Sequence, residues 1–154
     1  MNVFENPALL RAILIAAAGV AVGLLLSLGG GLARLVWKYR REAADVPKEE
    51  LLPALAMAFT PVTKVVYALV ATMALSQRNL AESELAILGT FAGGALALVA
   101  VVQGAWAAKL IDTPTAKEGL IGTFRFKLAL LGSVETMAIL ALVGMLVFSA
   151  RLSA

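Results

Sequence analysis

Four long apolar segments, separated by polar connections, make up most of the chain. They cover about Leu9–Leu35, Leu51–Ser76, Leu85–Ile111 and Leu120–Ala150. Because a helix needs about 20 apolar residues to cross a bilayer, the pattern predicts an all-α integral membrane protein with four transmembrane helices. We expect one membrane domain, residues 1–154, built from two hairpins at about 8–76 and 85–150.

The composition agrees with this pattern and narrows the chemistry. Of the 154 residues, 61% are hydrophobic and only 15% are charged, which is far from the composition of soluble domains. The sequence contains no histidine and no cysteine, so the commonest metal ligands, thiol nucleophiles and proton relays are missing. Covalent enzymatic chemistry and a bound cofactor are therefore not expected.

The basic residues predict the orientation in the membrane. The two longer connections, about 35–50 and 112–119, and the segment ends beside them hold nine basic residues: Arg34, Lys38, Arg40, Arg41, Lys48, Lys109, Lys117, Arg125 and Lys127. The opposite side holds three, Arg11, Arg78 and Arg151. The positive-inside rule then places both connections in the cytoplasm and both termini outside a cell membrane. Because these charges flank apolar segments, we expect lipid, and not nucleic acid, as their partner.

One carboxylate, Glu135, lies near the middle of the fourth segment. An acidic side chain at the centre of a membrane helix costs about 2.5–3.5 kcal/mol on insertion scales, so its presence needs a reason. The first hypothesis is ion handling. The alternative is a glutamate paired with a cation that only holds two helices together.

The second segment contains Pro61, which removes one helical hydrogen bond and leaves the carbonyl of Met57 without its usual partner. In lipid, a bound ion or a neighbouring polar group must satisfy that carbonyl. Thr63, Lys64 and Tyr67 follow within about one turn.

The third segment adds Gln103. Folding the hairpins back brings these polar residues to within a turn or two of the depth of Glu135. A hard cation such as Na⁺ prefers oxygen ligands, which Glu135, Thr63, Gln103 and a carbonyl near Pro61 can supply. A proton needs only the carboxylate and a hydrogen-bond partner such as Tyr67.

A weak internal repeat supports the two hairpins. Pro61–Val70 aligns with Val134–Val143, so that Thr63 meets Thr136 and Val62 takes the place of Glu135. Such a duplication leaves one carboxylate for every four helices.

Small residues concentrate in the first and third segments. Gly19 and Gly23 form a small-xxx-small pair in the first, and Gly93 lies among many alanines in the third. Because small residues let helix backbones approach closely, we expect these two segments to pack tightly.

Three motifs carry a resemblance to a known family. They are Val134-Glu135-Thr136-x-Ala138-Ile139-Leu140 in the last segment, Gln103-Gly104 in the third and Pro61-x-Thr63-x-x-x-Tyr67 in the second. With them, the chain resembles over almost its whole length the K subunit of V/A-type rotary ATPases and ATP synthases. That subunit is the four-helix, 16-kDa proteolipid of the membrane rotor ring (c-ring).

The resemblance implies a ring of identical subunits that turns against a stator membrane subunit facing Glu135. A central-stalk subunit would sit on the cytoplasmic loops, and ATP chemistry would belong to other subunits. Glu135 would carry the transported ion, with Thr63, Gln103 and the backbone carbonyl of Thr60 as further ligands. Tyr67 would hydrogen-bond to the carboxylate.

Two features depart from the family. Leu28-Gly29-Gly30-Gly31 replaces a more polar glycine-serine stretch, and Lys64 stands where sodium-binding members have a glutamine ligand. A lysine near Glu135 makes H⁺ the expected ion and disfavours Na⁺. The alternatives are a small transporter or channel gated by Lys64 and Glu135, and a structural membrane scaffold.

Overall fold

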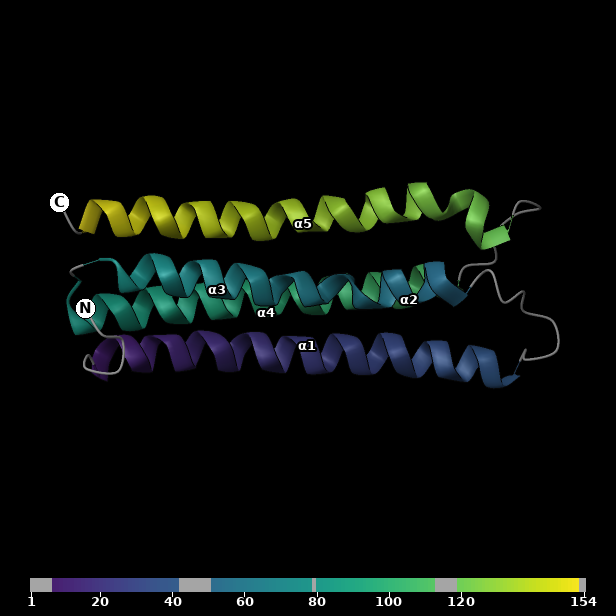
Figure 1. The fold of residues 1–154 in the computed structure, drawn as a ribbon, viewed down its shortest axis with the longest axis horizontal. Coiled ribbons are helices and arrows are strands. Elements are labelled where there is room, and N and C mark those ends of the chain that lie inside the picture. Colours follow the sequence, from purple (N-terminus) through teal and green to yellow (C-terminus); the bar gives the residue numbers. More distant parts are fainter. Residues whose placement is uncertain (1–6, 42–50, 79, 113–118, 153–154) are drawn as a thin grey trace.

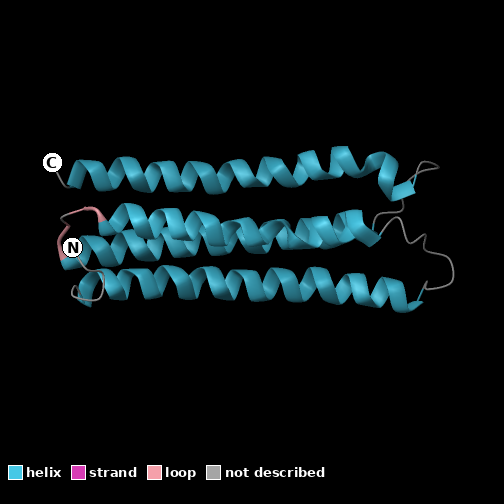
Figure 2. Ribbon diagram, viewed as in Figure 1, coloured by secondary structure: helices cyan, strands magenta, loops and turns pink. Residues whose placement is uncertain are grey.

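The computed structural model describes residues 7–41, 51–78, 80–112 and 119–152 (Figure 1). Its elements are α1 (Pro7–Arg41), α2 (Leu51–Phe59), the 3₁₀ turn η3 (Thr60–Val62), α3 (Thr63–Ser76), α4 (Glu82–Asp112) and α5 (Gly119–Leu152). No strand occurs in these residues, and the only irregular stretch described lies between α3 and α4 (Figure 2).

The helices form one elongated bundle (Figure 1). Four of them are long and apolar enough to cross a membrane, with α2, η3 and α3 together making one span, Leu52–Ser76. The start of α1 and the end of α5 lie at one end of the bundle, and the end of α1 and the start of α5 lie at the other. The prediction of an all-α protein with four membrane-length helices is therefore confirmed.

Two helix boundaries differ from the sequence prediction. The first helix continues to Arg41, about six residues beyond the predicted end, because no proline or glycine stands between Gly31 and Arg41 to stop it. Helix α4, which corresponds to the third predicted segment, starts at Glu82 and not at Leu85. The Glu84 carboxylate accepts a hydrogen bond from the backbone N–H of Ala81 at 2.9 Å and so caps the first turn. Part of the predicted loop at 35–50 is thus helical, and residues 42–50 and 113–118 lie outside the described residues.

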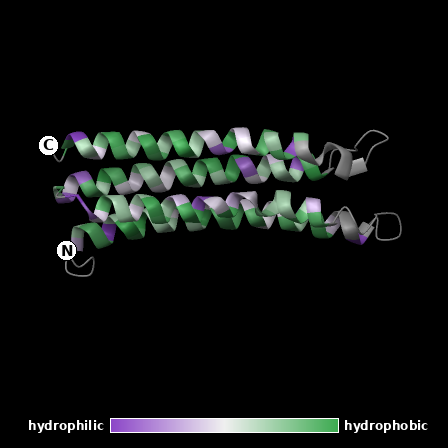
Figure 3. Ribbon diagram, turned by 45° about the horizontal axis from the view of Figure 1, so that its top comes forward, coloured by the Kyte–Doolittle hydropathy of each residue, from purple (hydrophilic) through white to green (hydrophobic). Residues whose placement is uncertain are grey.

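Large apolar side chains cover the outer faces of the bundle. Leu25, Leu69, Ile87 and Leu140 are all more than half exposed, and hydrophobic colouring runs along most of each helix (Figure 3). In water, so much exposed apolar surface would promote aggregation. In a bilayer, the same surface faces lipid.

The most extensive helix contact joins α1 to α4. Glycines make it possible: a Cβ atom on Gly93 would lie 2.6 Å from the Cα atom of Ala16, and one on Gly89 would lie 2.6 Å from the carbonyl oxygen of Ala12. Any side chain at these positions would push the two backbones apart. The predicted tight packing of the first and third segments is confirmed within one chain.

Helix α5 packs on α4 and, less extensively, on α3 and α2. Near the start of its membrane span, the buried Lys127 donates a hydrogen bond to the carbonyl of Leu110 at 2.9 Å. This carbonyl belongs to the last turn of α4, where a cation is favoured by the helix dipole. Farther along the bundle, α5 brings Glu135 to the other two helices.

Gly93→Ala should destabilise the chain by about 1–3 kcal/mol, because the added methyl group collides with the backbone of α1. Gly94→Ala is the matched control, since a methyl group added there would meet no atom of a neighbouring helix within 4 Å. Gly94→Ala should instead stabilise the chain by about 0.5–1 kcal/mol, because alanine has a higher helix propensity than glycine. Thermal unfolding of the purified protein in detergent measures both. Equal unfolding temperatures for the two variants would contradict the α1–α4 contact.

Candidate functional site

The break at Pro61 is repaired from within its own helix. The hydroxyl of Thr60 donates a hydrogen bond of 2.8 Å to the carbonyl of Met57, which is the group that Pro61 leaves without a backbone donor. The chain passes this point as the 3₁₀ turn η3 and resumes as α3 at Thr63. The predicted polar partner of Met57 is thus Thr60.

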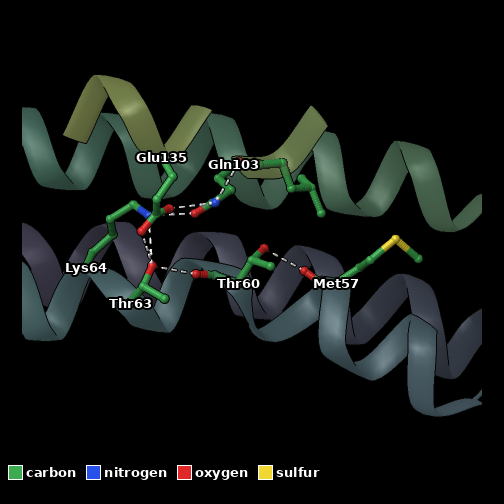
Figure 4. A network of polar contacts seen from close by, with 7 residues as sticks. Met57, Thr60, Thr63, Lys64, Gln103 and Glu135 are labelled. Carbon is green, nitrogen blue, oxygen red and sulfur yellow. Dashed lines mark hydrogen bonds and ion pairs between the residues drawn. The ribbon is translucent and has the colours of Figure 1, made fainter. Parts of the chain in front are cut away.

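Directly after this turn, four polar side chains from three helices converge (Figure 4). Thr63 and Lys64 come from α3, Gln103 from α4 and Glu135 from α5. Glu135 lies at the middle of the 34-residue α5, and Thr63, Lys64 and Gln103 also lie inside spans that are long and apolar enough to cross a membrane. We call these four residues the polar cluster.

An ion pair forms the centre of the polar cluster. The ammonium of Lys64 pairs with Oε2 of Glu135, and the Lys64 side chain is fully buried, whereas that of Glu135 is 18% exposed. A charge buried in an apolar bundle is tolerated only when it is paired and hydrogen-bonded. Lys64, which did not fit the family pattern, is therefore the partner of Glu135.

The amide of Gln103 connects both members of the pair. Its oxygen accepts a hydrogen bond from Lys64 at 2.8 Å, and its nitrogen donates to Oε2 of Glu135 at 2.9 Å and to the carbonyl of Leu131 at 3.1 Å. All polar atoms of the amide thus have partners, and their donor or acceptor character fixes its orientation. The Leu131 carbonyl was not among the predicted site groups, although its position one turn before Glu135 places it on the same face of α5.

Thr63 has one hydroxyl proton and two possible acceptors for it. Its Oγ1 atom lies 2.6 Å from Oε1 of Glu135 and 2.9 Å from the carbonyl of Thr60, and it also accepts a hydrogen bond from Lys64 at 3.0 Å. A hydroxyl donates only one hydrogen bond. With Glu135 ionised, the stronger, charge-assisted bond goes to the carboxylate.

The cluster opens sideways into a surface pocket of about 310 Å³ lined in part by Tyr67, Gly132 and Glu135. Tyr67 lines this pocket together with Glu135, and its ring centroid lies 5.7 Å from the Lys64 nitrogen. Along the bundle axis, apolar layers flank the site. Leu131, one turn before Glu135, belongs to one buried cluster, and Ala138, about one turn after it, belongs to another.

The structure brings together every site residue predicted from sequence. Thr63, Lys64, Gln103 and Glu135 bond to one another, Tyr67 lies beside them, and the Thr60 carbonyl contacts the cluster through Thr63. Within the described residues, no group of three His, Cys, Asp or Glu side chains is placed to hold a metal ion. Any cation bound at the polar cluster would therefore take its oxygen ligands from the Glu135 carboxylate, the Gln103 amide, the Thr63 hydroxyl and the backbone.

Comparison with protein-family models, with curated proteins and with solved structures finds no match to this chain. The function is therefore argued from the site itself.

Thr60→Val should destabilise the protein by about 1–3 kcal/mol, because it keeps the side-chain shape but leaves the Met57 carbonyl unsatisfied in an apolar surrounding. Ser133→Ala provides the comparison. Its hydroxyl also bonds three residues back, to Leu130 at 2.6 Å, but within a regular helix that already supplies a backbone donor. Chemical denaturation in detergent should show a clear loss for T60V and little change for S133A. A small effect of T60V would mean that another group satisfies Met57.

Proposed function

We propose that this chain is the proteolipid subunit of the membrane rotor ring of a V/A-type ATPase or ATP synthase, and that it translocates H⁺ on Glu135. The observation that carries the proposal is a single carboxylate at the middle of the apolar helices, partly exposed at the side of the bundle. An ionisable residue at that depth is a functional site by default. ATP chemistry would belong to other subunits of the complex.

The shape of the site supports exchange with a partner beside the bundle. Its pocket opens at the bundle surface next to Glu135, whereas apolar layers containing Leu131 and Ala138 flank it along the axis. An ion would therefore reach the carboxylate from the side, as a stator subunit facing Glu135 would require. This arrangement favours a lateral carrier over a channel that runs along the bundle.

The packing of the helices also suits a ring. The glycine-lined contact makes α1 and α4 the most closely packed pair, and narrow pairs of this kind fit an inner wall, where neighbouring subunits crowd together. The helices α3 and α5, which carry Lys64 and Glu135, would then face outward. Both basic connections would lie on the cytoplasmic side, where a central-stalk subunit can bind them, with both termini outside.

A structural scaffold is the second candidate, because the ion pair is fully hydrogen-bonded and links α3 to α5. The two functions differ in assembly. Electron microscopy of the protein purified in mild detergent should show closed rings with α5 on the outside. Monomers or dimers across a range of mild detergents would favour the scaffold.

Glu135→Gln should reduce proton transport by the assembled complex in vesicles to background, because the amide cannot take up and release the proton. This change leaves the Lys64 ammonium without a counter-charge, so the double variant Lys64→Gln, Glu135→Gln provides a neutral site that also lacks the carboxylate. Both should fail to transport while rings still form.

The control for this experiment is Glu82→Gln. Glu82 is exposed at the start of α4, where it pairs with Arg11 at 3.5 Å, far from the cluster along the helix. Proton uptake should therefore match that of the unaltered protein. Normal transport by the double variant would rule out Glu135 as the carrier.

A further inference from the structure

Lys64 differs from the other basic residues described because it lies at the middle of its apolar span, Leu52–Ser76, and not near a span end. It is the second residue of α3 and its side chain has no exposed surface. A buried ammonium is stable only if its charge and its donors are matched by the protein. The groups that accept hydrogen bonds from the Lys64 ammonium therefore indicate which ion the site can bind.

All three N–H donors of the Lys64 ammonium have acceptors. They are the Thr63 hydroxyl oxygen at 3.0 Å, the Gln103 amide oxygen at 2.8 Å and Oε2 of Glu135. An ammonium has three donors and no acceptor. The three oxygens therefore surround the Lys64 nitrogen as ligands surround a cation.

These side-chain oxygens are also the ones that a hard metal cation would need, because such ions are bound by carboxylate, amide and hydroxyl oxygens. One positive charge already balances the single negative charge of Glu135. A metal ion added to the site would leave an excess positive charge in an apolar surrounding, which is costly. Lys64 thus blocks a metal ion both by position and by charge.

We propose that the Lys64 ammonium fills the cation position of this site, so that the pair formed by Lys64 and Glu135 excludes metal ions. The choice of H⁺ as the carried ion rests on the proposed function of Glu135. The exclusion of metal ions is a property of the folded chain and is testable without transport.

Tyr67 is the remaining titratable side chain among the residues that line the pocket. Its ring lies 5.7 Å from the Lys64 nitrogen, and Gln103 and Thr63 carry no titratable group. The charge balance at the pocket is therefore set by Lys64 and Glu135.

Equilibrium binding of ²²Na⁺ to the purified full-length protein at neutral pH tests the exclusion. The unaltered protein should bind none, whereas Lys64→Gln should bind one ion per chain, because the glutamine restores an oxygen ligand and leaves Glu135 unbalanced. Lys64→Arg is the matched control and should bind none, since it keeps a permanent positive charge. Adding Glu135→Gln to Lys64→Gln should abolish the gained binding.

Sodium binding by the unaltered protein would overturn the proposal, and so would the absence of binding by folded K64Q. If K64Q does not fold, the unaltered protein still provides the test. A carboxyl-reactive carbodiimide should modify its Glu135 at the same rate in sodium and in choline salts. A slower reaction in sodium would show that a metal ion enters the site.

Failure of the proposed function is a separate result. It would appear as normal proton transport by the variants that lack the Glu135 carboxylate, whereas failure of the exclusion appears as metal-ion binding by the unaltered chain.

Discussion

The buried ion pair between Lys64 and Glu135 is the interaction on which the rest of this structure depends. Removing one partner of a buried pair typically costs about 3–5 kcal/mol, because the other charge is left without compensation. In this bundle the pair joins α3 to α5, and Gln103 ties both to α4. These three helices are therefore held in one register, in which all donors of the lysine have acceptors.

Apolar packing and polar contacts combine differently along the bundle. Between α1 and α4, Gly89 and Gly93 allow the backbones to approach until almost no space remains, so shape sets the distance. Helix α5 is held by apolar side chains such as Leu131 and Met145 in the buried clusters, and also by polar bonds, including the Lys127 bond to α4 and the polar cluster. The helix that carries the carboxylate is thus positioned by both kinds of contact.

Much of the fold could be predicted from the sequence, because segment length and hydropathy determine which stretches span a bilayer. The members of the site were also predictable, since few polar residues lie inside the spans and they share one depth. A lysine close to Glu135 was also expected, but the individual bonds were not. Sequence spacing does not reveal that all three donors of the Lys64 ammonium have acceptors, that Thr60 satisfies Met57 or that the Leu131 carbonyl completes the bonds of Gln103. Those contacts depend on the rotation of each helix about its axis, which apolar patterns on lipid-facing helices specify weakly.

The single proton of the Thr63 hydroxyl links two features that are otherwise separate. One possible acceptor is the carboxylate on α5, and the other is the Thr60 carbonyl inside the turn that Pro61 imposes. When the carboxylate is neutral it attracts this proton less, and the bond can pass to the backbone of the turn. Thr63 thereby connects the charge of a residue on α5 to the hydrogen bonding of the helix break in another span.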